Sequence, residues 1–344
     1  MSFLPRPDGW CRRWFAVALV VWVVGAIQPA GAASAWDIRK HNGEEYVSLE
    51  NIKQFYKFSK LSRSGSHLTL ENPKVVLNLT VGSAECTMNR VKFVFSRPVV
   101  DIGSQPYVSR TDLTKLIDPV LRPNFIKNAG AFRTVVLDPG HGGKDPGATN
   151  PYGTEAGYNL KLAGQVRAEL MKRGYKVVMT RTNDKYLSLQ ERVNLANAVR
   201  EDAVFISLHF NSGGRAARGI ETFTLSPPGV AHYGRGVVAA DGYQRTGNQH
   251  DSANVALATA THGMVVRGLG TNTFDRGIKR ARFTVLSGVR HPAILLEGGF
   301  MSHSYEARLI HKPEYQAALA KAVAAALDKY RAAVTNRVKT APPN

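Results

Sequence analysis

Between residues 132 and 332 the sequence alternates short apolar segments with segments of helical periodicity, and this alternation strongly constrains the fold. Strands are expected at residues 134–137, 176–180, 204–208, 220–225 and 293–296. Helices are expected at residues 158–173, 187–199, 252–266 and 313–331. Strands and helices that alternate at this spacing predict an α/β fold, with a doubly wound, mainly parallel sheet and helices on both faces.

The first strand runs directly into a sharp turn, Asp138-Pro139-Gly140, which is followed by His141. Pro fixes φ and Gly accepts positive φ, so the chain can reverse here. Open α/β sheets bind their ligands at the carboxyl ends of parallel strands. With glycine on either side, His141 is expected to be displayed there and not packed in the core.

Residues 36–122 precede this unit and carry the pattern Y-V-S-x-x-[ND]-[IL] twice, starting at Tyr46 and at Tyr107. In each copy a short β segment meets a serine that can cap the first turn of a helix. Strand-like runs at residues 75–81 and 91–95 lie between the two copies. The segment is therefore predicted to be a small α+β accessory domain, separated from residues 132–332 by a linker.

The amino terminus has the composition of a secretory signal peptide. Arg12 and Arg13 precede the apolar run 14–27, and A-x-A cleavage sites end at Ala32 and Ala35. We expect residues 1–32 to be a signal peptide and the protein to be exported to the periplasm or cell envelope; an uncleaved anchor is the alternative. No second apolar run could span a bilayer, so the mature protein is expected to be soluble.

The mature chain combines a strong positive charge with very few cysteines. The formal charge of the whole chain is +19, which indicates polyanionic surroundings such as cell-wall phosphates or acidic lipids. No zinc-finger, RNP or helix-turn-helix pattern occurs, so no nucleic-acid partner is predicted. Cys86 is the only cysteine after the leader, which excludes an intramolecular disulfide. Residues 333–344 are basic, end in Pro-Pro-Asn and are predicted to be a disordered tail.

Three further residues lie where strands end or just past a turn: Glu155, His209 and Glu297. Because carboxyl strand ends converge on one crevice, they can meet His141 there. Two histidines and a glutamate are the ligands of catalytic zinc sites, which leave the fourth position to a water whose pKa falls to about 7. The remaining carboxylate would then serve as a general base.

Five segments of residues 132–332 resemble, in order, the zinc-dependent N-acetylmuramoyl-L-alanine amidases of the type 3 class: DPGHGG, TRTNDKYLSLQERVNLAN, FISLHFNS, GIETF and LLEGGFMSH. The resemblance implies a peptidoglycan hydrolase that cleaves the amide between N-acetylmuramic acid and L-alanine. It also implies that His141, Glu155 and His209 bind Zn²⁺ and that Glu297 is the catalytic general base.

Residues 36–122 more weakly resemble the copper-amine-oxidase N-terminal-like stalk domain found ahead of exported wall enzymes, without the His or Cys cluster that copper requires. We expect this segment to position a monomeric enzyme, peripheral to the envelope, on its substrate. Two other classes stay open. A zinc carboxypeptidase would need an arginine clamp for a free carboxylate, for which Arg276, Arg280 and Arg282 are available. A non-catalytic wall-binding protein would lack hydrolysis.

Several residues near the motifs have two interpretations. Ala156 and Gly157 follow Glu155 where the family usually has charged residues, which makes Glu155 the ligand least supported by the sequence. His303 replaces a common family asparagine and is interpreted as a neighbour of a helix cap. Asp138 either accepts a hydrogen bond from His141 or is a turn residue. Asn211 could line the site.

Asp184 and Arg192 follow Thr180 in the sequence. Both are expected to hold the loop after Thr180 and not to touch substrate. Residues 226–251 interrupt the family pattern and are rich in Gly and Pro, with no Glu. They are predicted to form a mobile lip bearing Tyr233 and Tyr243, and not a long helix that blocks the site.

Overall fold

The computed structural model describes residues 36–336, which belong to one compact unit beginning at Trp36. The predicted signal peptide, and the predicted tail beyond residue 336, lie outside the described residues. No helix within residues 36–336 is long and apolar enough to cross a bilayer.

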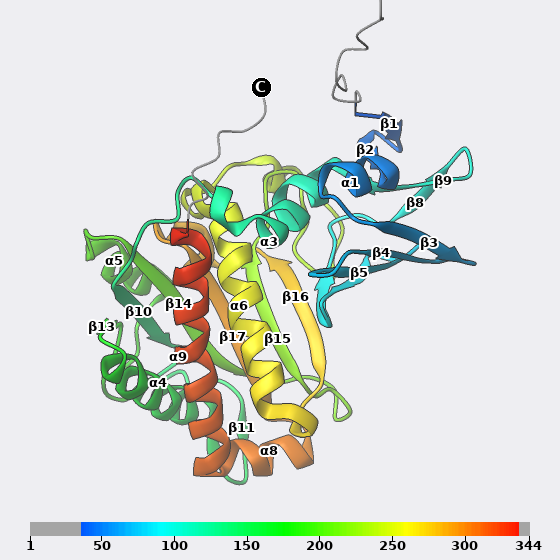
Figure 1. The fold of residues 1–344 in the computed structure, drawn as a ribbon. Coiled ribbons are helices and arrows are strands. Elements are labelled where there is room, and N and C mark those ends of the chain that lie inside the picture. The colour runs from blue at the N-terminus through cyan, green and yellow to red at the C-terminus, as the bar shows by residue number, and fades with distance from the viewer. Residues whose placement is uncertain (1–35, 337–344) are drawn as a thin grey trace, which may run out of the picture. The chain divides into compact units, whose positions relative to one another are not determined.

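An eleven-stranded mixed sheet runs through the described part of the chain (Figure 1). In sheet order its strands are β13 (Lys176–Met179), β10 (Thr134–Pro139), β14 (Ala203–Asn211), β17 (Ala293–Phe300), β15 (Ile220–Leu225), β16 (Asp275–Ala281), β7 (Val91–Val94), β6 (Glu85–Met88), β5 (Val76–Thr80), β4 (His67–Glu71) and β3 (Lys60–Ser64). The first four of these pair in parallel.

Helices cover both faces of the parallel strands because the side chains of each strand alternate between two apolar clusters. Val135 and Leu137 of β10 belong to the cluster formed with α4 (Glu155–Lys172), α6 (Asp251–Leu269) and α9 (Pro313–Thr335). Val136 belongs to the opposite cluster, with α5 (Leu189–Ala198) and α7 (Thr284–Gly288). Figure 1 shows α6 and α9 side by side over one face. The predicted α/β class is confirmed.

The strand direction reverses at β15. β15 pairs with β17 in the antiparallel direction, whereas β16 runs parallel to β15. Residues 212–219 join β14 to β15. This connection is shorter than the dozen or more residues that a crossover to a parallel strand requires, so the chain returns in the opposite direction.

Two of the expected helices have well-defined caps. Ser188 and Glu191 form a capping box at the start of α5. The hydroxyl of Thr154 accepts from Gly157 N, so α4 begins at Glu155, three residues before the predicted start at residue 158. Its first turn survives the glycine because the cap satisfies that glycine's amide.

Strands β14 and β17 are longer than predicted. They continue to Asn211 and Phe300, and His209 pairs with Glu297 across the two strands. Both residues therefore lie within strands and not beyond their ends. Helix α9 also extends four residues past its predicted end, into the segment predicted as a tail.

The two Y-V-S segments form matching turns in a separate four-stranded sheet of β1 (Ile38–His41), β2 (Glu44–Ser48), β9 (Gln105–Ser109) and β8 (Val100–Ile102). Ser48 caps α1 (Leu49–Phe55) and Ser109 caps α2 (Arg110–Asp112), as the sequence predicts. A π-helical turn, η1 (Leu113–Ile117), and α3 (Asp118–Leu121) follow.

The remaining N-terminal strands continue the main sheet. Phe93 of β7 pairs with Ile278 of β16, and Lys92 N donates to Asp275 Oδ2 at 2.9 Å. A single apolar cluster extends from β4–β7 to α6 and α9. Residues 36–122 and 132–332 thus share one sheet and one core. Their division into an accessory part and a catalytic part remains a prediction about what each segment does.

We expect Phe93→Ala to destabilise the whole unit by about 3–5 kcal/mol, because this fully buried ring lies at the junction of β7 and β16. Urea denaturation followed by fluorescence and circular dichroism should show one transition shifted to lower denaturant. Val76→Ala is the control, since Val76 is 39% exposed on β5. Two separate transitions, with the second unshifted, would show that the N-terminal strands fold independently.

Candidate active site

Three side chains meet at the carboxyl ends of β10 and β14. His141 Nε2 and His209 Nδ1 lie 3.1 and 2.8 Å from the same oxygen of Glu155, Oε1. One possible ligand atom from each residue lies within 4.8 Å of the other two. Within residues 36–336 this is the only group of three or more His, Cys, Asp or Glu side chains that could hold a metal ion. The structure thus brings together the three residues predicted as ligands.

The carboxylate of Glu155 is buried at the first position of α4. Burial opposes its ionisation, but hydrogen bonds from His141 and His209 outweigh burial and hold the pKa of Glu155 well below its usual value. Ala148 N also donates to Glu155 Oε2 at 3.0 Å. The hydrogen bond to Glu155 in turn raises the pKa of His141. A negative charge at this point faces two imidazoles, as a cation site requires.

Glycines leave the space in which the three ligands converge. A side chain on Gly140 would place its Cβ 2.1 Å from Cε1 of His209. A Cβ on Gly147, whose φ is +64°, would lie 2.6 Å from Glu155 Oε2. His141 itself has φ +59°, a left-handed conformation that is uncommon for residues other than glycine. Such strained conformations persist where the surroundings hold them in place.

Two buried arginines hold this loop. Arg181 donates to the carbonyls of Pro139 and Gly140, and also to that of Ala156 on α4. Arg192 donates to the carbonyls of Pro139 and His141. Arg192 Nε also donates to the carbonyl of Leu187 in the loop after Thr180, so Arg192 holds the predicted loop as well as the one that carries His141. Asp184 has the same role, since its Oδ1 accepts from Gly143 N at 2.9 Å.

Neither interpretation of Asp138 is correct. Its buried carboxylate accepts from Arg192 Nη1, Thr180 Oγ1 and Ser207 Oγ at 2.6–2.9 Å, and so joins β10 to its neighbours. The acceptor beside His141 is instead Asp145, whose Oδ2 lies 2.8 Å from His141 Nδ1. The sequence contained a signal for it, an aspartate four residues after the histidine in a loop that turns back on itself.

Arg181 and Glu221 were also missed by the sequence interpretation. Arg181 belongs to the TRTND motif, but no residue near it in the sequence indicates which carbonyls it binds. Glu221 pairs directly with Glu297 across β15 and β17. Its carboxylate accepts from Lys279 and Arg276, both at 2.5 Å, and from Asn211 at 3.0 Å. The side chain of Asn211, which the sequence suggested as a residue lining the site, therefore binds the Glu221 carboxylate.

Glu297 points to the same side of the sheet as His209 and lines a cavity of about 620 Å³ with it. Among the described residues, no group forms a hydrogen bond with its buried oxygen Oε2. Burial raises the pKa of Glu297 well above its usual value, and the nearby carboxylates Glu155 and Glu221 raise it further. A buried polar atom without a partner points to a ligand that the site is built to receive.

The cavity is lined by both polar and apolar side chains. The polar ones include His141, Asp145, His209 and Glu297, and the larger apolar ones, here called the apolar wall, are Tyr186, Leu187, Leu189, Phe283, Val285 and Leu295. A cavity of this size, with few converging polar groups, is typical of a small-molecule or polymer-end site.

The three arginines considered for a carboxylate clamp are engaged elsewhere. Arg276 pairs with Glu221, and Arg280 donates to the Thr224 hydroxyl and to a backbone carbonyl. Arg282 pairs with Asp241 and donates to three backbone carbonyls. None of them is free to bind a terminal carboxylate, which weighs against the carboxypeptidase alternative.

Residues 226–251 contain only short 3₁₀ turns, η3 (Ala239–Gly242) and η4 (Thr246–His250), so the prediction of no long helix is confirmed. The segment is anchored by the buried Asp241, which binds Arg235 and Arg282. Tyr243 is 64% exposed. His232 of this segment contacts Phe283, and Asp241 binds Arg282. Because Arg282 and Phe283 line the cavity, the segment supports part of its lining.

His303 caps α8 (Ser304–His311), where its Nδ1 accepts from Glu306 N at 3.4 Å, as its interpretation beside a helix cap predicts.

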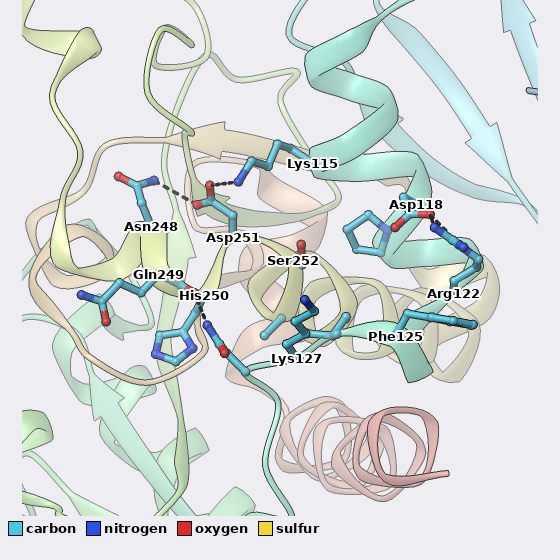
Figure 2. Close-up of a pocket in the computed structure, with 14 residues that line it drawn as sticks. Lys115, Asp118, Arg122, Phe125, Lys127, Asn248, Gln249, His250, Asp251 and Ser252 are labelled. Atoms are coloured by element: carbon cyan, nitrogen blue, oxygen red, sulfur yellow. Dashed lines mark hydrogen bonds and ion pairs between the residues drawn. The ribbon is translucent and has the colours of Figure 1, made fainter. Parts of the chain in front are cut away.

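A second pocket, of about 240 Å³, lies where residues 115–128 meet the start of α6 (Figure 2). Two ion pairs lie among its lining residues: Lys115 lies 3.2 Å from Asp251, and Arg122 lies 2.6 Å from Asp118. Figure 2 shows both pairs at the pocket wall. It contains none of the predicted site residues, and its Lys115–Asp251 ion pair fastens the N-terminal segment to the start of α6.

Comparison with known proteins gives a family match to residues 135–329, the part of the chain that contains the four predicted site residues. The sequence profile of the N-acetylmuramoyl-L-alanine amidase family (Amidase_3) matches residues 135–329. The uncharacterised protein YqiI of Bacillus subtilis is 32% identical over 198 residues, 58% of this chain and 84% of its own. The N-acetylmuramoyl-L-alanine amidase LytC of Bacillus subtilis is 32% identical over 222 residues, 64% of this chain but only 38% of its own length.

Among solved structures, an N-acetylmuramoyl-L-alanine amidase from Clostridium difficile 630 has 31% sequence identity and a TM-score of 0.48. That match covers 58% of this chain and 97% of the other. The family profile begins at residue 135. The stalk-like resemblance of residues 36–122 therefore remains a prediction.

We expect Gly140→Ala to abolish metal binding while leaving the protein folded, because the new methyl group would displace the His209 ring. Metal content after dialysis against a divalent cation, measured by mass spectrometry, is the test, with circular dichroism as the check on folding. Gly164→Ala in α4 is the control, since its Cβ would meet no atom within 4 Å. Full metal content in the Gly140 variant would contradict this geometry.

Proposed function

The chain belongs to the N-acetylmuramoyl-L-alanine amidase family over residues 135–329, and we propose that it cleaves the amide between N-acetylmuramic acid and L-alanine in peptidoglycan. The observation that carries the proposal is the convergence of His141, Glu155 and His209 at a cavity that Glu297 lines together with the two histidines. Peptidoglycan amidase activity is the function named for relatives such as LytC.

The donor set fits zinc. Two imidazole nitrogens and one carboxylate oxygen are the ligands of catalytic zinc sites, which keep one position open. Asp145 binds Nδ1 of His141 at 2.8 Å, which directs Nε2 towards Glu155 and the ligand group. Such an outer partner orients a ligand histidine and fixes its tautomer. We propose that His141, Glu155 and His209 hold the ion.

When bound, zinc would supply Lewis acidity that polarises the substrate carbonyl and lowers the pKa of water. Glu297 would accept a proton from the attacking water at its unpartnered Oε2. The water oxygen adds to the amide carbon, the carbon–nitrogen bond breaks, and Glu297 returns the proton to the departing L-alanine nitrogen. Burial raises the pKa of Glu297, which makes its carboxylate a stronger base than one in water and suits the uptake of this proton.

The apolar wall of the cavity has a separate role. Leu187, Leu189 and Phe283 limit the access of bulk water to Glu297 and offer a surface for the apolar faces of the sugar and the lactyl group. Arg192, which holds the carbonyl of His141, keeps the ligand loop in register with this wall. The chain thus combines charged groups that act on the amide with a wall that orients it.

We further propose that the protein acts outside the cytoplasm, in the periplasm or cell envelope, as a monomer peripheral to the membrane. Residues 36–122 would position it on the wall and take no part in the chemical step. Mass spectrometry of digested wall fragments tests the reaction class directly. Release of peptides that begin with L-alanine supports the amidase, release of carboxyl-terminal amino acids would indicate a carboxypeptidase, and no release would indicate a wall-binding protein.

We expect His209→Ala to lose bound zinc and hydrolysis together, because only His141 and Glu155 would then remain in the group of possible ligands. Metal analysis and release of peptide from purified wall are the measurements. His41→Ala, on strand β1, serves as a histidine control and should retain both. Full zinc content and full activity in His209→Ala would overturn the ligand assignment.

For Glu297→Gln the expected result is different. The amide keeps the size of the side chain but cannot accept the proton, so turnover should fall about 10²- to 10⁴-fold while zinc content and folding stay unchanged. Glu169→Gln, on the surface of α4 beside Lys172, is the matched control. If zinc were lost together with activity, Glu297 would be a ligand or a structural residue and not the base.

A further inference from the structure

A single row of side chains crosses the main sheet, starting at the metal site. His209 on β14 pairs with Glu297 on β17, and Glu297 pairs with Glu221 on β15. Residues that pair across neighbouring strands point to the same face. Glu221 in turn binds Arg276 and Lys279 of β16.

The row continues into the N-terminal strands. Gly277 lies between Arg276 and Ile278 on β16, and a Cβ on it would lie 3.1 Å from Cγ of Lys92 on β7. Lys92 pairs with Thr87 on β6, Thr87 with Asn78 on β5, and Asn78 with Thr69 on β4. The catalytic carboxylate and the face of β4–β6 are therefore parts of one face of one sheet.

The far end of this row is hollow. A cavity of about 490 Å³, here called the distal hollow, is lined by His67, Thr69, Asn78, Thr80, Glu85, Thr87 and Lys92, with three apolar residues at its base. Its polar groups form a ladder: Thr69 donates to Asn78 at 3.0 Å, and Asn78 donates to Thr87 at 3.1 Å. Asn78 is exposed.

The charge of the distal hollow differs from that of the chain as a whole. The chain carries a formal charge of +19, but Lys92 in the hollow lies 2.7 Å from Glu85, so this pair is neutral. The remaining lining residues offer hydroxyl, amide and imidazole groups. Such a surface suits an uncharged polymer rich in hydroxyl and amide groups better than a polyanion, which would favour unpaired lysine or arginine.

We propose that the distal hollow binds the glycan strand of the wall polymer, while the metal site acts on a peptide stem attached further along that strand. The inference rests on the proposed amidase function. Five strand spacings of about 4.8 Å separate Glu297 from Asn78, which is about 24 Å along the sheet. An extended polysaccharide can reach from Glu297 to Asn78. Because the sheet is twisted, the polysaccharide would follow a curved path across it.

The hollow would set affinity for long substrates without changing the chemical step. This role gives the N-terminal strands a function that depends on their being hydrogen-bonded to β16. A tethered but separately folded domain could bind the same polymer, yet it could not keep the polymer in register with Glu297.

The test uses the full chain and glycan strands from which all stem peptides have been removed and whose freed lactyl carboxylates have been methylated, so that the probe is uncharged. This probe contains no scissile amide, so binding is measured independently of catalysis. Thr69→Val with Thr87→Val removes both hydroxyls beside Asn78 and keeps β-branched side chains in the strands. Asn78→Ala is a second, independent variant. Thr114→Val is the control, since Thr114 is exposed outside the row and bonds to its own helix.

Sedimentation binding should give a Kd for peptide-free glycan that rises about tenfold in both hollow variants and is unchanged in the control. Their KM for intact wall should rise, with unchanged turnover of a short soluble muropeptide. The proposal is overturned if the parent protein does not bind peptide-free glycan, if the variants bind it equally well, or if binding requires anionic wall polymers. Glycan binding without amidase activity on any substrate would instead reject the proposed function alone.

Discussion

The buried carboxylate of Glu155 is the interaction on which the site depends. A carboxylate removed from water is costly unless it is paired and hydrogen-bonded. Here one of its oxygens lies within hydrogen-bonding distance of both His141, in the loop after β10, and His209, in β14. It also starts α4, where the positive end of the helix favours a negative charge. The same charge that stabilises the helix start thus draws the two imidazoles together.

The ligand loop needs external support because its own conformation is unfavourable. His141 adopts a left-handed backbone conformation, and the neighbouring glycines give the loop little stiffness of its own. Arg181 and Arg192 supply that stiffness by donating to consecutive carbonyls of residues 139–141. An arginine has five donors in a planar fork, so one side chain can satisfy several carbonyls that a turn leaves without partners.

The N-terminal strands β3 to β7 extend the main sheet beyond β16. Without β7, strand β16 would have an unpaired edge, which is a site for unwanted strand pairing. With β7 in place, the sheet continues through β6, β5 and β4, and its polar face extends away from Glu297. One set of strands therefore covers an edge, extends the core and lengthens the polar face of the sheet.

The sequence by itself determined the α/β class, the two Y-V-S turns and the four candidate site residues, three of which line the cavity. These follow from local periodicity, caps and motifs, which depend on neighbours in the chain. Only the tertiary structure decided that Asp145 and not Asp138 binds His141, that Arg181 and Glu221 belong to the site, and that β7 joins β16. Those contacts join residues through the fold, and nothing in the local sequence around Arg181 or Phe93 specifies the partner. Side-chain hydrogen bonds and strand neighbours depend on the packing of the whole chain, so the sequence identified the candidate site residues and the fold determined what holds them.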